Sequence, residues 1–125
     1  MNQNDLLSLQ DKMRIVQELV PGKQITIAHI IANPDDILYR KLGLDPAVEY
    51  ARTAIGIVTM SPAETAIIAG DIAIKSSGVE LGFVDRFSGT LIVTGTVSDV
   101  QASMTALTDY CRDVLGFTVC PITKT

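Results

Sequence analysis

The sequence predicts an α+β domain built on a split βαβ arrangement, in which an antiparallel sheet carries two helices on one face. From residue 54 onward, the apolar and turn patterns give the order strand, helix, strand, strand, helix, strand. Both helices follow residues typical of helix N-termini, and the two middle strands are close enough in sequence to form a hairpin. The chain of 125 residues has the length of one domain.

One strand and one short helix precede this unit. Lys23–Ala32 alternates as a β-strand does, and Asn33-Pro34-Asp35-Asp36 predicts a helix start with Asn33 as the cap and Pro34 in the first helical position. Gly43 is expected to end that helix. The residues expected on one face of the strand are Ile25, Ile27, His29 and Ile31.

The central unit begins with a buried strand and a helix. Ala54–Met60 is apolar and β-branched, and Ser61-Pro62-Ala63-Glu64 predicts an N-cap and capping box for a helix that runs to Ser77. Small residues along the helix would let another backbone approach closely. The stripe expected on its buried side consists of Ala66, Ile67, Gly70, Ala73 and Ile74.

A hairpin and a second helix complete the unit. Two β-rich runs between Val79 and Val97 fold back around Asp85-Arg86-Phe87-Ser88-Gly89, and Ser98 with Gln101 predicts the capping box of the next helix. Gly116 is expected to end this helix, and Phe117–Ile122 reads as an edge strand because Pro121 interrupts it. The apolar stripe of the helix consists of Val100, Met104, Leu107, Cys111 and Val114.

Composition limits the class of partner. The 10 basic and 14 acidic residues give a net charge of −4, and the basic residues are scattered, which argues against a nucleic-acid partner. Charged residues make up 19% of the chain, below the roughly 25% of an average domain, which suggests that other subunits cover part of the surface. Uncharged stretches such as Ala54–Pro62 are far shorter than the ~20 residues of a membrane span. We expect a soluble, cytoplasmic protein without a membrane partner.

The sequence offers little for catalysis or metal binding. His29 is the only histidine and alternates with isoleucines, so a satisfied core or interface residue is favoured over a general base. Cys111 and Cys120 lie on different predicted elements without metal-ligand spacing, and free thiols are favoured over a disulfide. Neither a cofactor nor a metal is expected, and Pro21-Gly22-Lys23 reads as a turn and not as a phosphate loop.

Several short segments together resemble a bacterial microcompartment shell domain. They are Ala54-Ile55-Gly56-Ile57, Asp71-Ile72-Ala73-Ile74-Lys75, Val79-Glu80-Leu81-Gly82-Phe83 and Gly95-Thr96-Val97-Ser98-Asp99-Val100. Further segments look like the circularly permuted hexameric shell proteins of ethanolamine, propanediol and choline utilisation compartments. These are Val20-Pro21-Gly22-Lys23-Gln24, Ile27-Ala28-His29, Asp85-Arg86-Phe87-Ser88-Gly89 and Ile122-Thr123-Lys124-Thr125. The similarity covers about residues 14 to 125.

The resemblance explains why a strand and a helix precede a complete unit. In the permuted type these elements come first, whereas in ordinary shell domains they close the chain. It implies two parts, an N-terminal extension over residues 1–20 and a permuted shell domain over residues 21–125. Either Gln24–Ile31 or Phe117–Ile122 could occupy the place of the closing strand, and we favour Gln24–Ile31 because it is longer and alternates better.

The resemblance also implies a hexagonal tile with a central pore. The residues that correspond to the pore-lining loop, usually Lys-Ile-Gly-Ser-Gly in ordinary members, are Asp85, Arg86, Phe87, Ser88 and Gly89. The bulky Phe87 departs from that pattern and argues for a plugged or gated centre. Alternatively, Asp85 and Arg86 form an ion pair between subunits while Phe87 packs in the interface.

The role expected of the N-terminal segment is implied by the resemblance alone. In the permuted family the corresponding segment forms, with its five symmetry mates, a small β-barrel that caps the pore, and closure of a barrel removes exposed strand edges. The residues carried over are Arg14, Ile15, Val16, Gln17, Glu18, Leu19 and Val20. Residues 1–13 have no assigned role.

Two positions correspond to the contact between neighbouring hexamers. Lys75 matches the edge lysine of ordinary shell hexamers, with a solvated surface lysine as the alternative. Asn33 falls where the usual edge motif has its arginine, and an amide cannot provide a guanidinium fork. Edge contacts are therefore expected to be weaker or different, as in a minor shell component.

The function implied is that of a noncatalytic, structural shell subunit in the bacterial cytoplasm. It would form homohexamers, contact other shell proteins, and help to confine a volatile or toxic aldehyde or dock encapsulated cargo. A regulatory small-ligand-binding domain is the alternative from another class, because split βαβ folds often bind effectors between subunits. A small enzyme ranks third.

Overall fold

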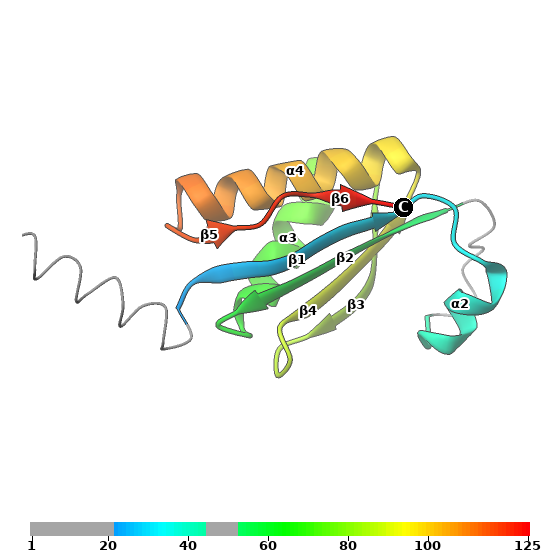
Figure 1. The fold of residues 1–125 in the computed structure, drawn as a ribbon, viewed down its shortest axis with the longest axis horizontal. Coiled ribbons are helices and arrows are strands. Elements are labelled where there is room, and N and C mark those ends of the chain that lie inside the picture. Colours follow the sequence, from blue (N-terminus) through cyan, green and yellow to red (C-terminus); the bar gives the residue numbers. More distant parts are fainter. Residues whose placement is uncertain (1–21, 45–52) are drawn as a thin grey trace, which may run out of the picture.

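The computed structural model describes residues 22–44 and 53–125, which form a six-stranded sheet with helices on both sides (Figure 1). The strands are β1 (Gln24–Ile31), β2 (Ala54–Ser61), β3 (Glu80–Asp85), β4 (Thr90–Gly95), β5 (Thr118–Val119) and β6 (Thr123–Lys124). The helices are α2 (Asp36–Lys41), α3 (Thr65–Ser76) and α4 (Val97–Asp113). The strand order is β3-β4-β2-β1-β5, and β6 also pairs with β1.

The pairing confirms the split βαβ unit and decides which segment closes the sheet. β3, β4, β2 and β1 pair antiparallel, so Gln24–Ile31 lies directly beside β2 as favoured from the sequence. The C-terminal strands β5 and β6 pair with β1 in parallel, which makes the complete sheet mixed. Pro121 lies in the break between them, as expected of an edge segment.

The main core lies between the sheet and the pair α3 and α4. The Oγ of Ser103, a fully buried side chain on α4, donates a hydrogen bond of 3.0 Å to the carbonyl of Ala73 on α3, so the two helices approach closely over small residues. A second cluster, in which Tyr39 and Leu44 cover Ile55 and Ile92, places α2 on the opposite face of the sheet. The fully buried side chains of the main core include Ala54, Val58, Leu91, Val100, Met104, Leu107 and Cys111.

A β-bulge changes which residues of β1 share a face. The pairing of β1 with β2 shifts register between Ile25 and Ile27, so Ile25 joins Ala28 and Ile30 in the main core while Ile27 is exposed. The prediction that Ile25 and Ile27 lie on one face is therefore wrong. The extra residue of a bulge reverses the alternation that follows it.

Helix α3 starts later than the sequence predicts, and its buried stripe is rotated toward Thr65 and Ala69. Ser61 is still paired with Gln24 in the sheet, and Glu64 stands at the N-cap with no side-chain hydrogen bond, so the expected capping box is absent. Ile67 and Ile74 are about half exposed. The residues of α3 that are buried are Thr65, Ala66, Ala69, Gly70 and Ala73.

The caps of α2 and α4 fall on neighbours of the predicted residues. Asp35, not Asn33, caps α2 by accepting a hydrogen bond from the amide of Ile37. Thr96, not Ser98, caps α4 by accepting from the amide of Asp99 at 3.1 Å. In both places several neighbouring residues have side chains that could cap the helix. The residue that does so is the one whose backbone is extended in φ and ψ.

The identity of the α4 cap can be tested by substitution. Thr96→Ala is expected to lower the free energy of unfolding by about 1 kcal/mol, because the Asp99 amide loses its acceptor. Ser98→Ala, two residues away, is expected to stay within about 0.5 kcal/mol. Urea denaturation of both variants measures the difference, and equal losses would show that Ser98 shares the cap.

Candidate functional site

The hairpin between β3 and β4 has a well-defined tip. The Asp85 carboxylate accepts hydrogen bonds from the Phe87 amide at 2.8 Å and from the Ser88 hydroxyl at 2.9 Å. The Gly89 amide donates to the Asp85 carbonyl at 2.9 Å, which closes the turn. The five residues singled out in the sequence therefore form one local structure held by its own hydrogen bonds.

Gly89 ties this tip to the neighbouring strand. Its carbonyl accepts a hydrogen bond of 2.9 Å from the amide of Met60 in β2, and its φ of +76° lies in the left-handed region. A Cβ at this position would lie 2.1 Å from the Met60 carbonyl oxygen. Only glycine fits both the backbone angle and the space.

The side chains at the tip point into solvent. Phe87 is 81% exposed, and the guanidinium carbon of Arg86 lies 4.9 Å from the centre of its ring, a cation–π contact. An ion pair of Asp85 with Arg86 across a subunit boundary stays a prediction. Within the chain, both Asp85 oxygens accept hydrogen bonds from residues of the turn.

The hydrogen bonds to Asp85 lower the pKa of its carboxyl below the ordinary value near 3.8, chiefly through the Phe87 amide and then the Ser88 hydroxyl. The contribution of this carboxylate to stability is therefore complete above pH about 4 and is lost as pH falls through the lower pKa of the folded chain. Carboxyl titration by NMR should show an Asp85 midpoint below 3.8, and Ser88→Ala should move it upward. A midpoint at or above 3.8 in the unchanged chain would contradict the turn geometry.

The two residues assigned to the hexamer edge are both exposed. Lys75, in the last turn of α3, forms an exposed ion pair of 2.8 Å with Asp71. Asn33 is exposed between β1 and α2. Among the residues described, no hydrogen bond joins them, so their proposed role depends on a neighbouring hexamer.

His29 links the C-terminal residues to β1 through side-chain hydrogen bonds, a role that the sequence pattern does not indicate. Its Nδ1 lies 2.6 Å from the Thr123 hydroxyl and its Nε2 lies 2.9 Å from the Thr125 hydroxyl. The backbone of Thr125 adds hydrogen bonds with Ile30 and Ala32. With both ring nitrogens in use, His29 is a satisfied structural residue, as favoured over a general base.

The two cysteines of the chain differ in their surroundings. Cys111 is buried, which raises the pKa of its thiol, and both it and the half-buried Cys120 are free. Within residues 22–44 and 53–125, no cluster of three or more His, Cys, Asp or Glu side chains could hold a metal. Over the same ranges, no helix is long and apolar enough to cross a membrane.

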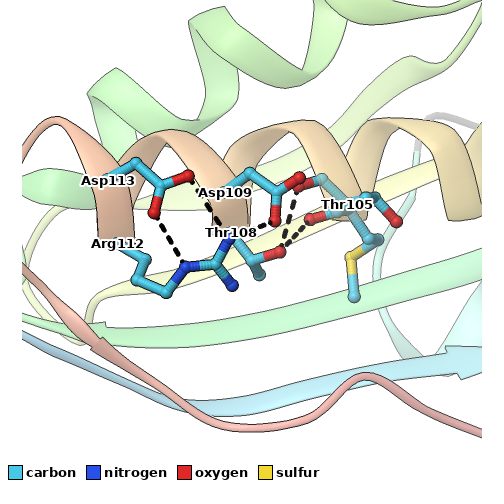
Figure 2. A network of polar contacts seen from close by, with 6 residues as sticks. Thr105, Thr108, Asp109, Arg112 and Asp113 are labelled. Atoms are coloured by element: carbon cyan, nitrogen blue, oxygen red, sulfur yellow. Dashed lines mark hydrogen bonds and ion pairs between the residues drawn. The ribbon is translucent and has the colours of Figure 1, made fainter.

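A second polar network lies on the surface of α4. Figure 2 shows Arg112 between Asp109 and Asp113, with nitrogen to oxygen distances of 2.9 Å to each. The two carboxylates raise the pKa of Arg112, and hydrogen bonds from Arg112 lower that of Asp113. One guanidinium is shared by two carboxylates on one solvated helix face, which is typical of a structural surface.

The segment assigned to the pore-capping barrel, Arg14–Val20, lies outside the described residues, as do residues 1–13 and 45–52. The barrel therefore stays a prediction.

The split βαβ unit, the extra leading strand and the exposed hairpin tip agree with the permuted shell-type domain expected from the sequence. The BMC domain family matches residues 54–123. The chain is 51% identical to the bacterial microcompartment shell protein PduU of Salmonella typhimurium, over 90% of this chain and 93% of that protein. It is 46% identical to EutS of Escherichia coli, over 91% and 98%. The chain belongs to the bacterial microcompartment shell protein family.

Solved structures agree with this membership. A structure described as a CutR flat hexamer superimposes with a TM-score of 0.78 at 43% identity, covering 85% of this chain and 94% of that one. A fused permuted hexameric shell protein shares the fold with a TM-score of 0.63 at 21% identity, covering 70% and 47%. The permuted order of elements expected from the sequence is thereby confirmed.

Proposed function

We propose that this chain is a noncatalytic structural subunit that assembles into homohexameric tiles of a bacterial microcompartment shell. The observation that carries the proposal is the close superposition on a chain of the CutR flat hexamer, with a TM-score of 0.78 over 85% of this chain. The exposed apolar side chains Ile67, Ile74 and Phe87 are consistent with it, because contact with other copies would bury them.

In such a hexamer the six hairpin tips form the central ring. Asp85, Arg86, Phe87, Ser88 and Gly89 then line or close the opening, and the large exposed side chain of Phe87 narrows it. The turn is already held within one chain by Asp85 and Gly89, so the ring gains its shape without rearrangement of the loop. Lys75 and Asn33 would then take part in the contact between neighbouring tiles, and other shell proteins or a cargo segment are the expected partners.

The N-terminal segment Arg14–Val20 caps this opening as a six-stranded barrel, one strand from each copy. The support is the sequence resemblance together with the need of short strands to complete their hydrogen bonds with neighbours. The tile then acts as a closed or gated part of the shell that confines an aldehyde intermediate in the bacterial cytoplasm.

Deletion of residues 1–20 separates the barrel from the tile. The shortened chain should still form six-membered rings in electron micrographs, now with an open centre. Loss of the rings would show that the segment holds the hexamer together and is not a cap. Rings in the full-length chain with a centre as open as in the deletion would contradict the barrel.

A further inference from the structure

The C-terminal residues lie along the outer edge of β1 as a strand that can separate from the rest of the fold. β6 runs parallel to β1 and, among the described strands, pairs with no other (Figure 1). Between β5 and β6, residues 120–122 have no strand pairing, and Pro121 is exposed. A change of backbone angles at this break would lift β6 from the edge and leave the antiparallel pairing of β1 with β2 intact.

His29 contacts this strand at alternate positions. Its Nδ1 lies 2.6 Å from the Thr123 hydroxyl and its Nε2 lies 2.9 Å from the Thr125 hydroxyl, so one ring binds both threonines. The residues before and between them point to the other face, because side chains alternate along a strand. There, Ile122 is half-buried against the main core, whereas Lys124 is exposed. The edge therefore favours an aliphatic residue and two alternate threonines, and it makes no demand on the residue between the threonines.

The backbone of Thr125 completes the contact. Its amide donates a hydrogen bond of 2.9 Å to the Ile30 carbonyl, and its carbonyl accepts one of 2.8 Å from the Ala32 amide. Without the C-terminal strand, these groups of Ile30 and Ala32 would lie unpaired at a sheet edge, which is a template for another strand. Sheet edges bind extended peptides in this way, with main-chain hydrogen bonds for affinity and alternate side chains for specificity.

We propose that the outer edge of β1 is a strand-binding site for an extended segment of the pattern Ile-Thr-x-Thr, filled by the chain's own residues 122–125 and open to the same segment of a second copy. An identical segment makes the same contacts whichever copy supplies it, so exchange between copies loses no hydrogen bond. The chain's own segment has the higher effective concentration, and exchange is favoured where many copies are held close together. His29 is the residue that sets the specificity of this site. The site is formed within one chain and does not depend on the proposed hexamer.

Hydrogen exchange of the Ala32 amide, measured by NMR, tests the site. In a chain that ends at Val119 this amide loses its acceptor and should exchange at least about tenfold faster than in the full-length chain. An acetylated peptide of residues 120–125, added at the millimolar effective concentration of a short tether, should restore slow exchange. The same peptide with Thr123→Val and Thr125→Val should not, because it keeps the backbone groups and loses both hydroxyls.

Two variants of the full-length chain separate the role of His29 from that of β1 as a whole. His29→Ala removes both ring contacts and should speed exchange of the Ala32 amide at least about tenfold. Thr26→Val is the matched control on the same strand. It removes the contact of 2.8 Å between the hydroxyls of Thr26 and Thr59 and should leave the Ala32 amide unchanged.

Exchange between copies is tested by mixing two chains. The shortened chain is isotope-labelled and mixed with an excess of unlabelled full-length His29→Ala chain, whose own edge holds its segment weakly. Exchange of the Ala32 amide in the labelled chain should slow, and it should not slow if the second chain also carries Thr123→Val.

The outcomes distinguish the site from the exchange. Absence of protection by the peptide, or equal effects of His29→Ala and Thr26→Val, would overturn the site. Protection by the peptide but not by the second chain would overturn exchange between copies. All of these results would leave the shell function standing, because that function is tested by the hexamer itself.

Discussion

Replacement of Gly89 by alanine is expected to lower the free energy of unfolding by about 3 kcal/mol. The residue has a φ of +76°, and the new Cβ would lie 2.1 Å from the Met60 carbonyl oxygen and 3.1 Å from the Cα of Ala63. Both neighbours are backbone atoms, so relief requires the hairpin tip to move away from β2. Urea denaturation at fixed protein concentration measures the loss.

Gly116→Ala is the matched control. Gly116 has a similar φ of +73°, but a Cβ there would meet nothing within 4 Å. Its replacement is expected to cost about 1 kcal/mol, which is the backbone strain alone. Equal losses at the two glycines would show that the close packing of the tip against β2 is wrong.

Leu107→Ala is expected to lower the free energy of unfolding by about 3 kcal/mol, because it leaves a cavity at the centre of the main core. Leu107 is fully buried on α4, within the cluster that joins this helix to α3 and the sheet. Thermal and urea unfolding of the variant provide the measurement.

Val114→Ala serves as the control for this truncation. The sequence pattern places Val114 on the same stripe as Leu107, but the structure leaves it 61% exposed beyond the end of α4. The substitution should therefore change the free energy of unfolding by less than about 0.5 kcal/mol. A loss near that of Leu107→Ala would mean that Val114 is covered, either in the chain or by another copy.

Alternation and spacing predict the elements of this fold well but not their exact boundaries. The apolar run of β2 and the stripe from Val100 to Cys111 are long enough for the period alone to identify them. The bulge in β1 adds a residue that sequence alternation cannot reveal, so alternation alone predicts the wrong face for Ile25. The N-caps are Asp35 and Thr96 and not the predicted residues, because several polar residues in a row could each cap the helix.

The sequence indicates which segment forms the candidate site but not the conformation and hydrogen bonds of that segment. A charged and aromatic turn between two β-rich runs marks Asp85–Gly89 as unusual, and Gly89 is a natural turn residue. The use of Asp85 within the turn, and not in a pair with Arg86, depends on the path of the backbone. The contact of His29 with Thr123 and Thr125 spans more than ninety residues of sequence. It results from the parallel pairing of β1 with β6, which no local sequence pattern indicates.

The mass of the full-length protein in solution, measured by multi-angle light scattering after size exclusion, tests the central claim most directly. A hexameric tile requires a single species of about 80 kDa, six times the 13.4 kDa of one chain. A stable monomer or dimer at working concentration would contradict the account. If such a species also gained thermal stability with an amino acid or a nucleotide, a regulatory ligand-binding domain would take its place.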